Sequence, residues 1–426
     1  MADINVEGPE TITSRDQQKT EHSVIECFKA FFLSNAANGG PQDITLDRDL
    51  HIQWLLRGLM QLPTNFAGLD ASRPWFVFWI SHALEMLGAF DEDRWASKVG
   101  SFLKHCQDPA GGFGGGPAQL PHLAPTYAAT AALIIAGKEV SYSAADREKT
   151  YQFLMRMKSP SGGFMMHEEG ETDMRGTYCA MATASMLHIL TDELMEGVPE
   201  YVRRCQTFEG GIAGEEGLEA HGGYSYCGLA ALCIIGKAGV LDLDLFLNWA
   251  CKRQMALEGG FCGRTNKLVD SCYSFWLGAI FPLLYEAFLQ RGEDASVVAM
   301  LPERHLWFTP SPLQVYVFLA CQHRTGGLRD KPGKSADFYH TCYALSGVAA
   351  VQHGLEGPCV TGEPSNKLDR VDFYYNVLLE KSQRKCAYFE ALPPLKIDGK
   401  EISVAEGSGV ARARKRILES AKPDAE

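Results

Sequence analysis

Apolar residues recur along this chain in blocks that leave almost no polar face. Six blocks share an aromatic residue followed by small apolar ones: WFVFWISHAL (75–84), TYAATAAL (126–133), TYCAMATA (177–184), SYCGLAAL (225–232), SFWLGAI (274–280) and TCYALSG (341–347). Their spacing is close to 50 residues, apart from one longer interval with an insertion at 277–325 that carries no readable pattern. Because a helix that is apolar all round is buried all round, the blocks predict six helices in the interior of one structure.

A Gly-Gly pair stands about 15 residues before five of the six blocks, and four of the pairs follow a more polar, helix-like segment ending in Gln or Lys. The pairs begin at Gly111, Gly162, Gly210, Gly259 and Gly326. Glycine lets a chain leave a helix through positive φ, so the predicted unit is helix, Gly-rich loop, helix. An open solenoid is the alternative. All-round burial favours an all-α fold, an α–α toroid (a six-hairpin α6–α6 barrel) with the polar helices outside.

The two ends of the chain lack this pattern. We expect residues 1–20 to be a disordered tail, residues 21–395 to form the α–α barrel domain, and residues 396–426 to be a flexible extension with a basic cluster. That cluster, ARARKR (411–416), is typical of a solvated tail, and a localisation or docking element is the alternative.

Composition excludes several classes of protein. The net charge of −12 argues against broad nucleic-acid binding. Thirteen Cys without regular spacing do not predict a disulfide framework, and the N-terminal sequence has no secretory pattern. No apolar run reaches the length of a membrane helix. We therefore expect a reduced, cytoplasmic protein without integral membrane contact.

Ionisable residues recur at one position of the repeat. Ten residues after the second Gly of each pair stand His122, Asp173, His221, Asp270 and Asp337. In a toroid these positions share one end of the central space, where packing alone predicts small or apolar residues. Asp270 and Cys272 lie in one repeat, and His340 stands three residues after the same position in another.

Asp, Cys and His are good Zn²⁺ ligands, and three protein ligands leave a fourth position open for catalysis. Each residue alone has an ordinary role: Asp270 as a helix cap, Cys272 as a small buried side chain, His340 as a core imidazole. The shared repeat position favours a zinc site.

Cations gather beside this trio. Arg264, Lys267, Tyr273 and His221 predict a site for a polyanion such as diphosphate, and a solvated charged loop is the alternative. Gly222 and Gly223 would let backbone approach a ligand. We expect aromatic side chains to line the rest of the cavity; they are Trp75, Trp79, Tyr127, Tyr178, Tyr224, Trp276, Tyr339 and Tyr343.

Five long motifs carry a family resemblance: DASRPWFVFW (70–79), HLAPTYAA (122–129), EAHGGYSYCGLAAL (219–232), EGGFCGRTNKLVDSCYSFW (258–276) and LRDKPGKSADFYHTCYALSG (328–347). Over roughly residues 50–380 the chain resembles the β subunits of protein farnesyltransferases. The resemblance implies a helical-repeat α subunit as partner and one Zn²⁺ per β subunit, held by Asp270, Cys272 and His340. It also implies transfer of farnesyl from farnesyl diphosphate to the Cys thiol of proteins with a C-terminal Cys-aliphatic-aliphatic-X box, such as small GTPases, which forms a thioether.

The resemblance also assigns contacts residue by residue. Farnesyl diphosphate would meet Arg175, Tyr178, His221, Gly222, Gly223, Tyr224, Cys227, Arg264, Thr265, Asn266, Lys267, Tyr273, Ser274, Phe275, Trp276 and Lys331. The peptide would meet Ser72, Trp75, Trp79, His122, Ala124, Pro125 and Tyr339. Asp330 would hold Mg²⁺ against the diphosphate.

Lipid length is a separate question, because related subunits transfer geranylgeranyl. In this resemblance bulky Trp75 and Tyr343 shorten the pocket to fifteen carbons, and Asp330 fits the farnesyl type. Two other classes compete. Terpene cyclases share the barrel but use an acidic motif, and FDEDRW (90–95) lies outside the repeat position. A non-catalytic scaffold would have no reason to keep both a zinc trio and a diphosphate cluster.

Overall fold

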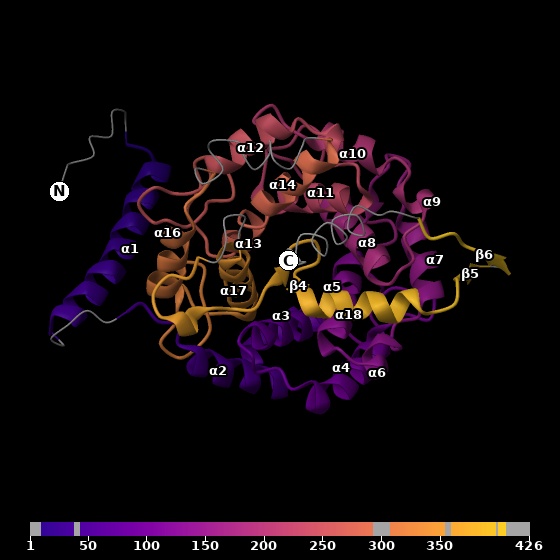
Figure 1. Ribbon diagram of the computed structural model, residues 1–426, viewed down its shortest axis with the longest axis horizontal. Helices are drawn as coiled ribbons and strands as arrows, with labels where there is room; N and C mark the ends of the chain where they lie inside the picture. The colour runs from indigo at the N-terminus through magenta and orange to yellow at the C-terminus, as the bar shows by residue number, and fades with distance from the viewer. Residues whose placement is uncertain (1–9, 38–42, 293–306, 354–358, 398, 406–426) are drawn as a thin grey trace, which may run out of the picture.

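The inner helices form a closed ring (Figure 1). A computed structural model describes residues 10–37, 43–292, 307–353, 359–397 and 399–405. The inner helices are α3 (Arg73–Met86), α5 (Leu123–Ala136), α8 (Met174–Met186), α11 (Gly222–Ile235), the broken pair α13 (Tyr273–Trp276) and α14 (Ile280–Gln290), and α17 (Phe338–Gln352). Each contacts the next, and α17 contacts α3. The predicted six-hairpin α–α toroid is confirmed, and the open solenoid is wrong.

The outer helices bury one face each. They are α2 (Arg48–Met60), α4 (Glu92–Cys106), α7 (Arg147–Met157), α10 (Val198–Cys205), α12 (Leu243–Cys251), and α16 (Pro310–Val315) with the π-helical turn Tyr316–Cys321. In α4 the buried residues include Trp95, Val99, Leu103 and Cys106, at helical spacing. In α5, by contrast, every residue except Ala124 is buried. This difference in burial agrees with the sequence, in which the outer helices are more polar than the inner ones.

The first glycine of each Gly-Gly pair has positive φ, as predicted. It also lies against the outer helix of the next hairpin. A Cβ on Gly111 would collide with the carbonyl oxygen of Lys149 in α7, and one on Gly326 would lie 2.8 Å from the carbonyl oxygen of Leu50 in α2. The sixth hairpin therefore packs against the first through the same kind of backbone contact that joins the second to sixth hairpins in succession, and this contact closes the ring.

A C-terminal hairpin closes the centre of the ring beneath the inner helices. Strands β3 (Val371–Asp372) and β4 (Val377–Leu378) are antiparallel. Between them, the carbonyl oxygens of residues 373–375 accept bonds from Tyr127 (2.8 Å), Tyr178 (3.0 Å) and Tyr226 (3.0 Å) on three successive inner helices. The yellow hairpin lies inside the ring in Figure 1, with the next helix, α18 (Leu379–Glu390), crossing below it.

Lys381 fastens α18 to the ring. Its ammonium group contacts Glu85 at 2.7 Å, Glu92 at 2.5 Å and the carbonyl oxygen of Ile135 at 2.8 Å. The residue is 3% exposed, so it depends on these oxygens because burial has removed its water.

Shorter elements complete the fold. They are the helices α6 (Glu139–Tyr142) and α9 (Asp192–Met195), the 3₁₀ turns 64–72, 238–240 and 364–366, and the antiparallel strands β1 (Phe164–Met165) and β2 (Thr172–Asp173). No helix within the described ranges is long and apolar enough to cross a membrane.

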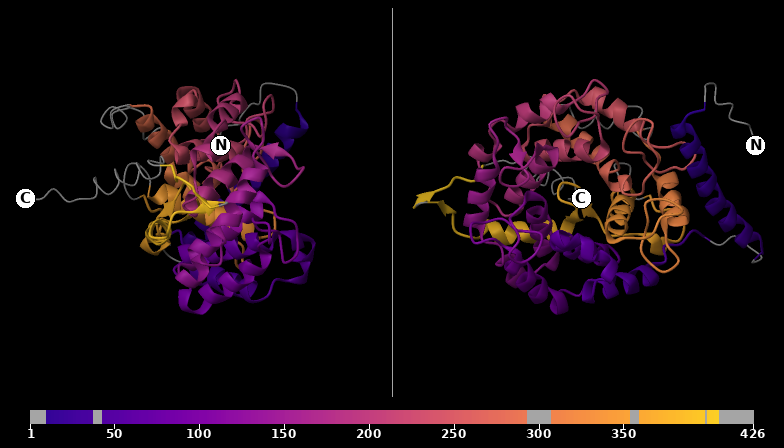
Figure 2. Two further views of the ribbon diagram at one scale, coloured as in Figure 1. Left: turned by 90° about the vertical axis from the view of Figure 1, so that its right-hand side faces the viewer. Right: turned by 180° about the vertical axis from the view of Figure 1, so that it is seen from behind.

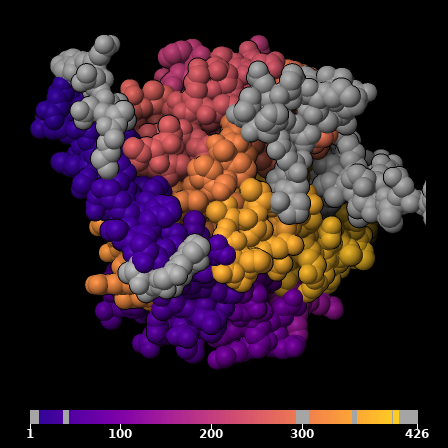
Figure 3. Space-filling model, turned by 60° about the vertical axis from the view of Figure 1, so that its left-hand side comes forward, coloured from indigo at the N-terminus to yellow at the C-terminus, as the bar shows by residue number. Residues whose placement is uncertain are grey.

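The N-terminal prediction is wrong for part of its range. Residues from Ile12 onward form α1 (Ile12–Ala37), which lies along the outside of the body (indigo in Figure 3). The helix packs against the turn Tyr316–Cys321, buries Val24 completely, and places the Gln17 amide 2.8 Å from Glu258. These contacts come from distant parts of the chain, so the polar local sequence did not reveal them. Residues 1–9 lie outside the described ranges.

One segment without a readable sequence pattern contains helices, and one further expectation needs correction. The insertion at 277–325 contains regular helices, since α14 continues the fifth inner helix and α16 begins the sixth outer one. Strands β5 (Lys396–Ile397) and β6 (Lys400–Glu401) pair in the expected flexible tail and project from the ring (Figures 1 and 2). The Ala405 N–H donates to the carbonyl oxygen of Leu190 at 2.8 Å. The cluster at 411–416 lies outside the described residues.

Candidate active site

The recurring ionisable position is the N-cap of the inner helix in four repeats, and Asp270 holds the turn that leads into α13 in the fifth. Each residue there accepts a hydrogen bond from a backbone N–H two or three positions later, at 2.7 to 3.0 Å; the five are His122, Asp173, His221, Asp270 and Asp337. The predicted equivalence of these positions is confirmed. The expectation that structure alone would favour small or apolar residues there is wrong, because capping requires an acceptor. A ligand role has to rest on geometry beyond the cap.

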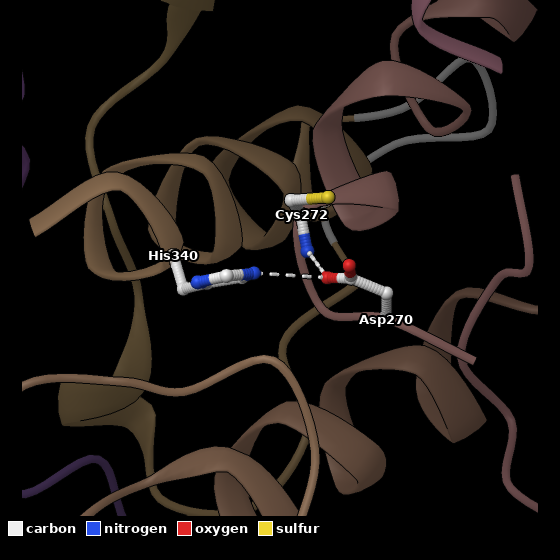
Figure 4. Close-up of side chains that lie close together, drawn as sticks. All are labelled: Asp270, Cys272 and His340. Atoms are coloured by element: carbon white, nitrogen blue, oxygen red, sulfur yellow. Dashed lines mark hydrogen bonds and ion pairs between the residues drawn. The ribbon is translucent and has the colours of Figure 1, made fainter. Parts of the chain in front are cut away.

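Asp270, Cys272 and His340 have that further geometry. One ligand atom of each lies within 4.8 Å of the other two, and Figure 4 shows the imidazole and the carboxylate facing each other. His340 Nε2 is 3.3 Å from Asp270 Oδ1, which also accepts from the Cys272 N–H at 2.9 Å. The fold therefore brings together three donors separated by up to 70 positions in the sequence.

Asp337 holds the other side of the His340 ring. Its two carboxylate oxygens accept from His340 Nδ1 at 2.6 Å and from the His340 backbone N–H at 2.7 Å. A histidine that binds a metal usually donates its second ring N–H to such a carboxylate, which fixes the ring and its tautomer. Nε2 is thereby left for a metal. The donor set and the supporting carboxylate fit Zn²⁺.

The charges around the trio favour the protonated forms of His340 and Cys272. Burial alone would lower the pKa of His340, but its bonds to Asp270 and Asp337 outweigh burial and raise the pKa to about 10. Burial and the nearby Asp270 charge raise the pKa of the Cys272 thiol well above its usual value. The pKa of Asp270 is lowered, because the interaction with His340 outweighs burial. A metal ion that occupied this position would have to displace the His340 and Cys272 protons.

A hydrogen-bonded pair, His221 and Tyr273, lies beside the trio. A backbone N–H can only donate, so the 3.0 Å bond from Gly223 N–H to His221 Nδ1 leaves Nδ1 without a proton. The ring proton is then on Nε2, which lies 3.0 Å from the Tyr273 hydroxyl oxygen and donates to it. Burial and the charge of Arg264 lower the pKa of His221 to about 4, consistent with a neutral ring. The Tyr273 O–H is therefore free to donate to a ligand.

Two glycines make the slot for the Tyr273 ring. A Cβ on Gly263 would collide with the ring, and one on Gly222 would lie 3.1 Å from it and 2.6 Å from Leu277. Gly222 is thus needed for packing, whereas it was predicted to admit a ligand. Gly263 was part of a quoted motif but was not singled out, since its role depends on a side chain ten residues away.

The loop 264–267 is at the edge of the site. Arg264 forms an ion pair with Glu219 at 3.2 Å, and its charge acts on both His221 and Tyr273. Thr265 bonds to Glu209 at 2.8 Å and receives a bond from Arg253 at 3.0 Å. Asn266 turns the loop with φ of 57°, and Lys267 is exposed.

A cavity of about 370 Å³ opens next to the His221–Tyr273 pair. Fourteen of the predicted contact residues line it: Trp75, Trp79, His122, Ala124, Arg175, Tyr178, His221, Gly223, Tyr224, Cys227, Tyr273, Trp276, Tyr339 and Tyr343. Tyr127, which was expected among the aromatic residues of the cavity, also lines it, and so do Met166 and Cys179, which were not predicted. Met166 lies outside the aromatic blocks, so its sequence gave no signal.

Trp276 and Tyr343 stack at 4.3 Å, and Trp75 stacks on Trp79 at 5.4 Å. These pairs give the cavity rigid aromatic walls on the sides of α13 and α3.

Several predicted contacts do not line this cavity. Ser274 and Phe275 are fully buried in the packing between inner helices, and Pro125 is buried within α5. Ser72 precedes α3 at the edge of the ring. Arg175 lines the cavity, but its guanidinium is bound by Asp173 and Glu171, so the stem of the side chain provides the apolar surface.

Asp330 lies next to the trio, and its carbonyl oxygen accepts from the Ser271 N–H at 2.9 Å. Its carboxylate forms an ion pair with Lys331. Burial and the Asp270 charge raise the pKa of Asp330 despite that pair. A cation at Asp330 would have to displace Lys331 or share the carboxylate with it.

Comparisons with known proteins agree with the fold. Residues 46–377 match the family model described as "Prenyltransferase alpha-alpha toroid domain". The chain is 41% identical to a protein farnesyltransferase subunit beta from Pisum sativum, covering 75% of this chain and 90% of that protein. It is 38% identical to one from Arabidopsis thaliana, covering 89% and 90%. The chain belongs to the protein farnesyltransferase β-subunit family.

Membership of the protein farnesyltransferase β-subunit family confirms the predicted enzyme class, a protein prenyltransferase. A solved structure, Candida albicans protein geranylgeranyltransferase-I complexed with GGPP, has the same fold, with a TM-score of 0.66 over 80% of this chain and 98% of that one. Its sequence identity is 18%, so the likeness concerns the fold alone.

Proposed function

We propose that this chain, as the catalytic β subunit of a protein farnesyltransferase, binds one Zn²⁺ and joins farnesyl to the cysteine of a C-terminal Cys-aliphatic-aliphatic-X box. The observation that carries the proposal is the meeting of Asp270, Cys272 and His340 within 4.8 Å. A helical-repeat α subunit is the proposed partner, and proteins such as small GTPases are the proposed substrates.

Asp270, Cys272 and His340 would hold the zinc, and Asp337 orients the His340 ring by its 2.6 Å bond. Bound zinc lowers the pKa of an incoming thiol, so that the substrate cysteine reacts as a thiolate. The sulfur forms a bond to C1 of farnesyl diphosphate, and the C1–O bond breaks with its electron pair leaving on the diphosphate. The thiol proton passes to solvent.

The residues beside the trio stabilise the departing charge. The Tyr273 hydroxyl, oriented by His221, donates to a diphosphate oxygen, and the Arg264 charge lies within range of both residues. Lys267 and Lys331 complete the cationic side. Asp330 is the proposed Mg²⁺ ligand, a role that would require Lys331 to leave its ion pair with the carboxylate.

The cavity accommodates the hydrocarbon and the peptide side chains. Tyr178, Tyr224, Cys227, Trp276 and the stem of Arg175 form the proposed lipid wall, while Trp75, Trp79, His122, Ala124 and Tyr339 are the proposed peptide contacts. Trp75 and Tyr343 set the length at fifteen carbons, because their rings fill space that a longer isoprenoid needs.

The test is prenyl transfer to a labelled peptide ending in a Cys-aliphatic-aliphatic-Met box. The chain is co-expressed with an α subunit and supplied with farnesyl or geranylgeranyl diphosphate. Asp270→Ala should abolish transfer and remove the zinc. Asp242→Ala, which removes a cap on outer helix α12, should leave both in place.

Geranylgeranyl transfer equal to farnesyl transfer would contradict the lipid assignment. Retained zinc without transfer of either lipid would favour the non-catalytic scaffold.

A further inference from the structure

A second cavity of about 530 Å³ lies on the outside of the ring, between outer helices α2 and α4. Its floor is the outward face of α3, formed by Phe76, Val77 and Ile80, whereas Trp75 and Trp79 of the same helix line the candidate active site. The two cavities are therefore on opposite sides of one helix. The side walls of the outer one, which we call the α2–α4 groove, are apolar: Leu59, Met60, Leu62, Trp95, Val99 and Phe102.

The charged residues that line the α2–α4 groove are basic. They are Arg73, Arg94 and Lys98, and no Asp or Glu of the described residues joins them, although the whole chain carries a net charge of −12. Arg73 pairs with Asp70. Within the described ranges, Arg94 and Lys98 have no carboxylate partner, and their side chains lie over the Trp95 ring at 4.8 and 5.0 Å.

We propose that the α2–α4 groove binds a single-chain amphiphilic anion, with the hydrocarbon on α3 and the anionic head at Arg94 and Lys98. The groove is in the size range of small-molecule sites, roughly 300 to 1,000 Å³. A tail would remove water from Val77, Phe102 and Leu59, which are partly exposed. The head supplies a negatively charged partner for Arg94 and Lys98. An arginine can bind a carboxylate or a phosphate with two hydrogen bonds. The proposal does not depend on the chemistry assigned to the inner cavity.

The probe for the test is a fluorescent fatty acid, 11-(dansylamino)undecanoate, titrated into the full chain co-expressed with its α subunit. Saturating farnesyl diphosphate keeps the inner cavity occupied. We expect saturable binding that the double variant Arg94→Glu/Lys98→Glu weakens at least tenfold. Val77→Trp, which fills the floor of the groove, should weaken it as strongly. The matched control is Lys104→Glu, an exposed cation on the same helix but outside the lining, which should have no effect.

Competitors identify the head group. Hexadecanoate and hexadecyl phosphate should displace the probe, and whichever is stronger identifies the head group; hexadecanol should be at least tenfold weaker than either. Equal displacement by hexadecanol would overturn the proposed role of the cations. Unchanged binding in both groove variants would overturn the location. Absence of saturable binding in the complex would mean that the partner subunit covers the groove, and would overturn the proposal as well.

Discussion

Changing Asp337 to Asn tests whether the carboxylate behind His340 contributes to metal binding. The two oxygens of Asp337 accept two different N–H groups of His340, one from the ring and one from the backbone. An amide has one oxygen, so the substituted side chain would satisfy one donor and place its own NH₂ group against the other. The change also removes the negative charge that makes the imidazole a better ligand. The size of the side chain and its place before α17 stay the same.

Loss of such a supporting carboxylate typically weakens metal binding by about 10- to 100-fold, or about 1.4 to 2.7 kcal/mol. We therefore expect Asp337→Asn to raise the zinc Kd by that factor while the chain stays folded. The measurement is competition with a chromophoric chelator, with zinc content after dialysis as a second readout.

Asp146→Asn is the matched control for Asp337→Asn. Asp146 caps α7 by accepting from the backbone N–H of Lys149 at 3.0 Å, a role that an amide oxygen can keep, and it lies far from the trio in the sequence. Its zinc Kd should equal that of the wild type. A Kd for Asp337→Asn within twofold of the wild-type value would refute the role given to Asp337.

Three further changes test other contacts. Tyr273→Phe removes the hydroxyl oriented by His221, and single-turnover transfer should slow by about 10- to 150-fold, the worth of one hydrogen bond to a charged group; an unchanged rate would exclude direct donation. Lys381→Met should cost about 3 to 5 kcal/mol in urea unfolding at pH 8. The cost should be smaller at pH 5.5, because burial raises the pKa of Glu85 to about 7. Stability from protonated Glu85 is therefore complete below its usual pKa of 4.5 and is lost as the pH rises through about 7; equal costs at both pH values would contradict this pairing. Trp75→Ala should shift the farnesyl-to-geranylgeranyl kcat/KM ratio by about tenfold or more toward the longer lipid, and a constant ratio would remove Trp75 as a length determinant.

The repeat explains why so much of the site was predictable. Asp270 and His340 lie 70 positions apart, yet counting from the Gly pairs placed them at corresponding ends of two inner helices, since packing is the same in each hairpin. Counting could not separate the caps from the ligands, because Asp173 and Asp270 both satisfy a backbone N–H. What separates them is the neighbour in the adjacent hairpin, which for Asp270 is His340, and that depends on tertiary distance.

Contacts between distant segments were the hardest to predict. The bond between Gln17 and Glu258 joins residues 241 positions apart and belongs to no repeat, so α1 was missed. The tautomer of His221 depends on a backbone N–H and on a tyrosine from another hairpin. Burial repeats along the chain, so it is visible as a pattern in the sequence. A single hydrogen bond between distant segments does not repeat, so no sequence pattern reveals it.

The contact of Gly326 with α2 has an evolutionary consequence. An open array can gain or lose units at either end, since each unit touches only its neighbours, and so change the size of its binding surface. A ring closed by the same glycine contact at all five Gly-Gly loops has no free end. Its diameter is fixed at six hairpins, so relatives that accept different substrates must differ in the side chains inside the ring. For this architecture, specificity evolves by substitution, and insertions are confined to links such as the one between α14 and α16.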